Sequence, residues 1–249
     1  MDFIIELMEN MTITDVSAVS AVSIPKKVST EDTGKMFEMG LCLAYGTPYD
    51  GKYKYSMELP EKLKPRLAKA LDLFPLCEHT AKKGARYDFT AINDDTKHLS
   101  AKTAKKGIGK VAPQVIGQSR PKKFCELIGV EYTTDANLKE YIQTHIKSIL
   151  PILVSYTFDC PNIYYKQKED TIRFITLNKP VEWDKYNFVW SRDYTEWGNS
   201  ATLKIVLEKK EMALIEFQFH TKSRNNMAIR WCYDNFLTIF NDHLTIINI

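Results

Sequence analysis

Residues 86–103 read RYDFTAINDDTKHLSAKT and predict the element around which the fold is built. The two ends of this stretch, RYDFTAI and KHLSAKT, are short runs typical of strands. The polar triplet at residues 93–95 separates them and is typical of a turn. The stretch therefore predicts a β-hairpin.

The alternation of side chains along a strand gives this hairpin a polar face and an apolar face. Ser100 and Lys102 are two residues apart, so both project to one face beside Asp88, while Phe89 and Leu99 face the core. Metal-dependent cleavage of a phosphodiester needs an acidic group that holds a divalent cation and a positive charge near the attacking water or the phosphate. Asp88 and Lys102 have the chemistry for these two tasks, although they could also be a turn acid and a solvated strand lysine.

This arrangement over residues 78–103 resembles the PD-(D/E)xK nuclease superfamily, which includes many type II restriction endonucleases. Tyr87 stands where the family usually has Pro, and Ser100 stands where it usually has Asp or Glu. Some restriction enzymes with a non-acidic residue at the second position take a carboxylate from elsewhere. The resemblance implies a fold of class α/β, with a central mixed β-sheet flanked by helices and a C-terminal β-hairpin.

The resemblance also implies a site for one or two Mg²⁺ ions. Asp88 would ligate the metal, and the second carboxylate would be Glu78, Glu38 or Asp94. Glu78 is preferred because it lies ten residues before Asp88, and Glu38, on the first predicted helix, comes next. The nuclease interpretation requires that one of these carboxylates joins Asp88.

The remaining catalytic roles fall on the second strand of the hairpin. By the resemblance, Lys102 would position or deprotonate the attacking water and stabilise charge on the phosphate. Ser100 would contribute its hydroxyl or its backbone carbonyl. The products would carry 5′-phosphate and 3′-hydroxyl ends.

The charge of the chain is concentrated around this hairpin. Residues 82–123 hold eleven Lys or Arg and three Asp, a net charge of +8, whereas the whole chain carries only +3 and the remainder is therefore −5. A basic block of this size attracts polyanions, of which nucleic acid is the commonest. The alternative is a solvated surface loop. We expect the cations of this block to contact phosphates: Lys105, Lys106, Lys110, Arg120 and Lys122. The amides of Gln114 and Gln118 could contact bases or orient a water, or they could be ordinary loop amides.

A second polar cluster, EFQFH at residues 216–220, lies in a predicted strand. Glu216, Gln218 and His220 share one face, and the two Phe residues between them share the other. Arg224 and Asn225 follow at once, so the cluster predicts an edge that could read bases in DNA. A half-exposed amphipathic strand is the plainer interpretation, and a second metal site using Glu216 and His220 is another.

The remaining elements follow from periodicity and punctuation. We expect helices at 31–46, 60–74, 121–129 and 135–150, an extended or irregular segment at 111–117, and strand character after Pro151, with strands at 171–177, 201–208 and 213–220. Residues 227–240 could form a strand or a helix. Asp135 is the expected N-cap of the helix at 135–150.

Composition and missing motifs exclude several classes of protein. With 26% charged and 44% hydrophobic residues the chain is neither disordered nor fibrous, and no apolar run is long enough for a membrane span. Five scattered Cys without a CxxC pair indicate neither a zinc ribbon nor a disulfide framework, and reduced thiols and an N-terminus without signal-peptide character fit the cytoplasm. The phosphate-binding, dinucleotide, nucleophile-elbow and zincin motifs are absent.

The resemblance, together with the basic block, implies a Mg²⁺-dependent, sequence-specific double-stranded DNA endonuclease of the type II restriction class, a hydrolase that acts as a homodimer. Residues 1–249 would form one nuclease domain, with a helical part (1–75), the catalytic hairpin and basic segment (76–130), and a β-rich part for DNA recognition (131–249). The alternatives are a non-catalytic DNA- or RNA-binding protein, a repair or junction nuclease of the same superfamily, and an enzyme acting on a small molecule.

Overall fold

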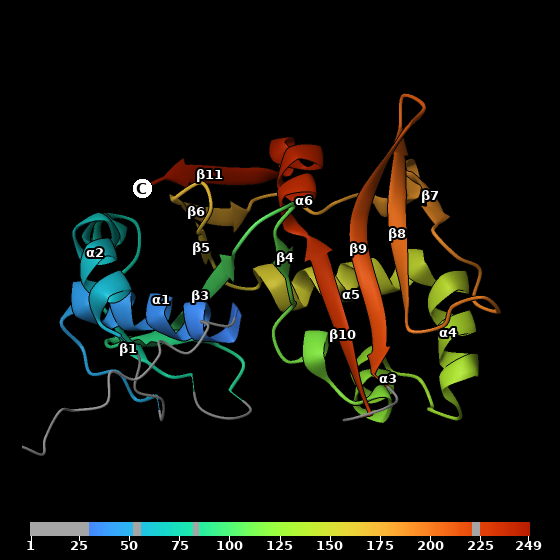
Figure 1. Cartoon of the computed structure of the whole chain (residues 1–249), viewed down its shortest axis with the longest axis horizontal. Coiled ribbons are helices and arrows are strands. Elements are labelled where there is room, and N and C mark those ends of the chain that lie inside the picture. The colour runs from blue at the N-terminus through green and yellow to red at the C-terminus, as the bar shows by residue number, and fades with distance from the viewer. Residues whose placement is uncertain (1–29, 52–55, 82–84, 221–224) are drawn as a thin grey trace, which may run out of the picture.

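The computed structural model describes residues 30–51, 56–81, 85–220 and 225–249 (Figure 1). Within these ranges the chain forms six α-helices: α1 (Thr30–Tyr45), α2 (Glu58–Leu67), α3 (Pro121–Ile128), α4 (Asp135–Thr144), α5 (Ile146–Phe158) and α6 (Tyr233–Ile239). No helix of the described part is long and apolar enough to cross a membrane.

The first of two sheets is mixed and has the strand order β1-β2-β3-β5-β6-β11. Its strands are β1 (Cys77–His79), β2 (Phe89–Ala91), β3 (Asp94–Ala104), β5 (Asn162–Lys166), β6 (Thr171–Leu177) and β11 (Leu244–Asn248). β3 and β5 run parallel and the other neighbours run antiparallel, which confirms the expected mixed sheet. The hairpin predicted at residues 86–103 is β2–β3, with Phe89 opposite Leu99.

The second sheet is antiparallel and has the order β4-β10-β9-β8-β7. Its strands are β4 (Lys110–Val111), β7 (Asn187–Trp190), β8 (Ser200–Leu207), β9 (Lys210–His220) and β10 (Asn226–Cys232). The expected C-terminal hairpin is β8–β9, and it forms the middle of this second sheet, which the sequence patterns did not predict. Pairing of β4 with β10 joins segments about 120 residues apart, and no local pattern reports such a contact.

Two apolar cores lie on opposite faces of the first sheet, and the alternation of β5 shows how they are separated. Ile163 and Tyr165 pack into a core with α1 and α2, where Tyr165 stacks on Phe37 at 5.5 Å between ring centroids. Tyr164 between them points to the other core, which α5, α6 and the second sheet share. Figure 1 shows α1 and α2 at one end of the molecule and the second sheet at the other, with β3 of the first sheet between them and β4 at the near edge of the second. This arrangement is compatible with the predicted single domain.

The expected helix at 135–150 is present but is broken into two, and the change to strands comes after Phe158 and not at Pro151. The chain breaks at His145 into α4 and α5, and α5 continues through Pro151 to Phe158. A proline inside a helix costs about 3 kcal/mol. The buried stripe of α5, which includes Leu150, Leu153 and Val154, outweighs that cost because it covers the core between the sheets.

The structure also shows where two of the expected helices begin or end and what residues 227–240 form. Thr134, and not Asp135, is the N-cap of α4, since its hydroxyl accepts a hydrogen bond from the Asn137 N–H at 3.1 Å. The expected helix at 60–74 is α2 followed by a 3₁₀ turn (Ala68–Asp72). Residues 227–240 form both alternatives in turn, the strand β10 and then α6.

Candidate active site

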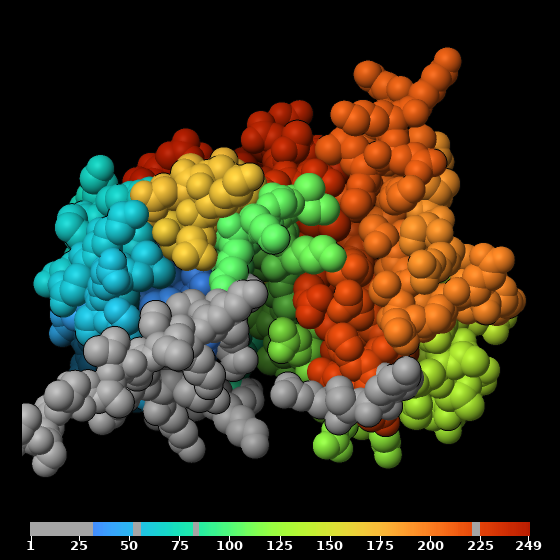
Figure 2. All heavy atoms as spheres, viewed as in Figure 1, coloured from blue at the N-terminus to red at the C-terminus, as the bar shows by residue number. Residues whose placement is uncertain are grey.

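A pocket of about 700 Å³ opens where the two sheets meet. Its walls come from α1, the second half of β3, the strand β4 with the segment after it, and the strand β10: Gly34, Lys35, Glu38, Ala101, Lys102, Thr103, Lys110, Val111, Ala112, Gln118 and Arg230. The space-filling view shows the green segment that follows β3 at the surface beside the orange and red strands of the second sheet (Figure 2). The pocket therefore adjoins the described part of the basic segment.

The pocket exists because β3 is longer than β2. β2 pairs with β3 only as far as Phe89 opposite Leu99, so the edge of β3 beyond Ser100 is open on the β2 side. Asp88, the residue just before β2, covers the start of this edge: its Oδ2 accepts hydrogen bonds from the Ala101 N–H at 2.8 Å and from the Ser100 hydroxyl at 2.9 Å. The Ser100 hydroxyl therefore binds Asp88, while its catalytic contribution stays a prediction.

The charge state of Asp88 depends on burial and on two neighbours. Desolvation raises the pKa of its carboxyl, while the positive charge of Lys102 lowers it and the negative charge of Glu38 raises it. The two hydrogen bonds to Oδ2 also lower the pKa, and they leave the other oxygen, Oδ1, unused by these donors. A carboxylate held in this way is poised to gain a cation, because a cation would offset the cost of its burial.

Glu38 supplies a second carboxylate at the same place. It is buried on α1, where the Lys35 ammonium lies 2.8 and 2.9 Å from its two oxygens. The ring of His79, whose side chain is 1% exposed, places Nε2 3.1 Å from Glu38 Oε2. His79 Nδ1 accepts a hydrogen bond from the Asp50 N–H at 3.3 Å. Nε2 therefore carries the ring N–H and donates a hydrogen bond to Glu38. His79 and Lys35 therefore fix the orientation of the carboxylate.

Glu78, the preferred second acid, lies elsewhere. β1 buries Cys77 and His79 and turns Glu78 out to solvent, so the residue that points inward is His79. The neighbouring carboxylate whose charge raises the pKa of Asp88 is Glu38. The structure therefore favours Glu38 over Glu78, because strand alternation in β1 points Glu78 away from the core on which α1 packs.

Asp94, the other alternative, lies at the far end of β3. It caps the hairpin turn by accepting from the Thr96 N–H and hydroxyl and pairs with Lys97. Eight residues of strand separate it from Lys102, which is about 26 Å at the usual rise. Asp94 therefore serves the turn and not the pocket.

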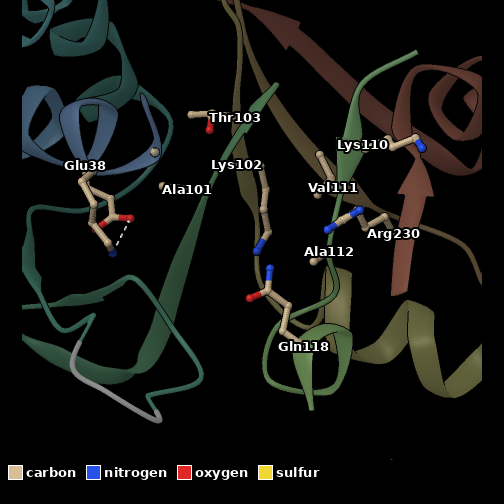
Figure 3. A pocket seen from close by; sticks show the side chains of 11 residues that line it. Glu38, Ala101, Lys102, Thr103, Lys110, Val111, Ala112, Gln118 and Arg230 are labelled. Carbon is tan, nitrogen blue, oxygen red and sulfur yellow. Dashed lines mark hydrogen bonds and ion pairs between the residues drawn. The ribbon is translucent and has the colours of Figure 1, made fainter. Parts of the chain in front are cut away.

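Lys102 lies in the pocket as the hairpin predicted. In Figure 3 its side chain extends from β3 toward the amide of Gln118, and Lys110 and Arg230 lie on the opposite wall. Glu38 and its ion pair with Lys35 form the wall on the α1 side. Within the described residues no three His, Cys, Asp or Glu side chains cluster as a metal site. Asp88 and Glu38 nevertheless offer the oxygen donors that Mg²⁺ takes one or two at a time.

Most residues of the basic segment that are expected to contact DNA lie at the surface. Lys106, Arg120 and Lys122 are exposed, Lys105 is half-buried, and Lys82 and Lys83 lie outside the described residues. Lys110 and Gln118 are exposed and line the pocket.

The expected contact of Gln114 with bases or water in the DNA interface is wrong, because this residue is 7% exposed and its side chain cannot reach DNA. Its side-chain amide donates to Cys160 Sγ at 3.5 Å, and its backbone N–H donates to the carbonyl of Tyr156 on α5. The segment after β4 turns this side chain inward to dock on α5.

The second polar cluster has the predicted faces. Phe217 and Phe219 are buried, whereas Glu216 and Gln218 are half-buried and His220 is exposed on the open side of β9. Asn225 is exposed, and Arg224 lies outside the described residues. Sequence reasoning missed the partner of this cluster, Arg230 of β10. Only strand pairing places it opposite Glu216.

The chain is similar to a type II restriction enzyme. This relative, type II restriction enzyme CviAII of Paramecium bursaria Chlorella virus 1, is 41% identical over 220 residues, which cover 87% of this chain and 62% of the relative. The chain therefore spans less than two thirds of the relative's length. No family model matches the chain, and no solved structure matches it significantly.

Proposed function

We propose that this protein is a Mg²⁺-dependent, sequence-specific endonuclease of the type II restriction class that hydrolyses phosphodiester bonds in double-stranded DNA. The observation that carries the proposal is that Glu38 and Lys102 line one pocket and that the charges of both act on the buried carboxyl of Asp88 at the open edge of β3. The similarity to a protein named as a type II restriction enzyme supports the same class. The PD-(D/E)xK assignment rests on the hairpin motif and its open edge.

In this proposal Asp88 and Glu38 hold Mg²⁺ through carboxylate oxygens, and the bound ion would activate water and neutralise charge on the phosphate. Ser100 and the Ala101 N–H hold Asp88, and His79 and Lys35 hold Glu38. Lys102 orients the attacking water and stabilises the negative charge that develops on the phosphate. Water adds to phosphorus in line, the P–O3′ bond breaks, and the ends are 5′-phosphate and protonated 3′-hydroxyl.

DNA would cross the pocket with its backbone along the basic segment. Lys105, Lys106, Lys110, Arg120 and Lys122 are proposed to contact phosphates, and Gln118, Gln218, His220 and Asn225 to lie nearer the bases. A palindromic target has two-fold symmetry, so we infer that the enzyme acts as a homodimer.

Incubation of the protein with phage DNA and Mg²⁺ tests the proposal. We expect a discrete set of fragments whose sequenced ends share one short motif, and no cleavage when EDTA removes divalent cations. DNA binding without cleavage in Mg²⁺, Mn²⁺ or Ca²⁺ would instead identify a non-catalytic binding protein. Cleavage that follows DNA structure, and not sequence, would identify a repair or junction nuclease.

The choice of second carboxylate is tested by a matched pair, Glu38→Gln and Glu78→Gln. Glu38→Gln is expected to raise the Mg²⁺ concentration for half-maximal cleavage by about 10- to 100-fold, because it removes a charge that faces the metal. Glu78→Gln is expected to cleave like the wild type, since Glu78 is exposed on the outer side of β1. The reverse outcome would return the metal site to Glu78.

A further inference from the structure

Arg230 joins the catalytic pocket to the open face of the second sheet. It lies in β10 directly opposite Glu216 of β9, and Gln218 is the next residue on the same face. Its side chain is 31% exposed and lines the same pocket as Lys102 (Figure 3). Figure 1 shows α5 passing behind this sheet, and Arg230 shares the face of Glu216 and Gln218, opposite the buried Phe217 and Phe219.

The guanidinium of Arg230 is held in place but not neutralised by close contact. Its Nη1 donates to Gln218 Oε1 at 2.9 Å, and Nη1 is 3.9 Å from Glu216 Oε2. Glu216 makes its short contact elsewhere, with the Lys110 ammonium at 2.8 Å. An arginine has five N–H donors, so most of those on Arg230 stay available for a ligand in the pocket.

The contact with Gln218 also decides what this surface can bind. Because the amide oxygen of Gln218 accepts from Arg230, the amide NH₂ is the group that Gln218 offers outward. Arg230 and Gln218 together therefore present mainly N–H donors, since one lone pair of the Gln218 oxygen is already used by Arg230. In the major groove guanine presents two acceptors, N7 and O6, whereas cytosine presents a donor. A planar, pre-oriented guanidinium matches the two guanine acceptors as a bidentate pair.

We propose that Arg230, positioned by Gln218 and Glu216, reads a guanine of the recognition sequence in the major groove close to the scissile phosphate. The inference rests on the proposed function and goes further, since it assigns specificity to one side chain. The neighbouring cation Lys110 provides the contrast. Its flexible stem carries a point charge, and we expect it to contact phosphate.

The test first maps the wild-type recognition sequence from the fragment ends, and then compares Arg230→Gln with Lys110→Gln. Arg230→Gln is expected to accept other base pairs at one guanine position, with discrimination lowered about 10- to 100-fold. Lys110→Gln is expected to weaken cleavage on all sequences alike and to reduce the salt dependence of binding by about one phosphate contact. Both variants lose one positive charge, so a loss of base discrimination in Arg230→Gln alone cannot be an effect of net charge.

Base analogues give a second measurement that does not depend on the variant folding. Replacing the guanines of the site one at a time by 7-deazaguanine removes the N7 acceptor, and at one position this should slow wild-type cleavage by about 10-fold or more. Arg230→Gln should show no further loss at that position. A site without guanine, no sensitive guanine, or a uniform loss in Arg230→Gln would overturn the inference. Failure of the wild type to cut DNA at all would instead refute the proposed function.

Discussion

The substitution Asp88→Asn is expected to reduce DNA cleavage by at least about 1,000-fold, the equivalent of about 4 kcal/mol of transition-state stabilisation. Asparagine keeps an oxygen that can accept from Ser100 and Ala101, so the edge of β3 stays covered. It removes the charge that would hold Mg²⁺. Cleavage of a plasmid in Mg²⁺ under single-turnover conditions measures the effect.

Stability measurements separate this loss from unfolding. Burial raises the pKa of Asp88, so its ionisation costs stability at neutral pH, and the metal-free wild type should gain stability as the pH falls through that raised pKa. Asp88→Asn should therefore melt at the same temperature as the wild type or higher. Mg²⁺ should raise the Tm of the wild type and not that of the variant. Cleavage by Asp88→Asn at a tenth of the wild-type rate would remove Asp88 from the site.

The raised pKa of Asp88 also predicts the pH dependence of cleavage by the wild type. Metal binding needs the carboxylate form, and a raised pKa means that Asp88 takes up a proton at a higher pH than an ordinary aspartate. Cleavage should fall on the acidic side earlier than the usual Asp pKa would predict, and extra Mg²⁺ should partly restore it.

The substitution Lys102→Ala is expected to lower cleavage by about 100- to 1,000-fold, because the pocket loses the cation that faces the phosphate. The Tm increase caused by Mg²⁺ should persist, since both carboxylates remain. The positive charge of Lys102 lowers the pKa of Asp88, so its removal should also move the acidic limb of the pH profile to higher pH.

Lys97→Ala is the matched control for Lys102→Ala, because both lysines belong to β3. Lys97 is exposed and pairs with Asp94 at the hairpin turn, away from the pocket. It should cleave like the wild type. Equal losses in the two variants would mean that β3 lysines act through overall charge and would contradict the catalytic role of Lys102.

Local patterns predicted the parts of the site that lie within one hairpin. Ser100 and Lys102 were placed on one face beside Asp88 because side chains alternate along a strand, and the structure shows the contact of Asp88 with Ser100. The identity of the second acid stays a prediction, and the structure places Glu38 among the charges that act on Asp88 and leaves Glu78 exposed. Glu78 is closer to Asp88 in sequence than Glu38, but α1 carries Glu38 across the sheet, and His79 binds it there.

The amino-acid sequence by itself determined several of the helices and strands, the polar faces of the β2–β3 hairpin and β9, and the concentration of positive charge around residues 82–123. These features depend on residues that are near one another in the chain, so their patterns are local. Only the tertiary structure decided that there are two sheets, that Glu38 accompanies Asp88, and that Arg230 lines the pocket with Lys102. Each of these depends on pairing or packing between distant segments, which burial of the two cores selects.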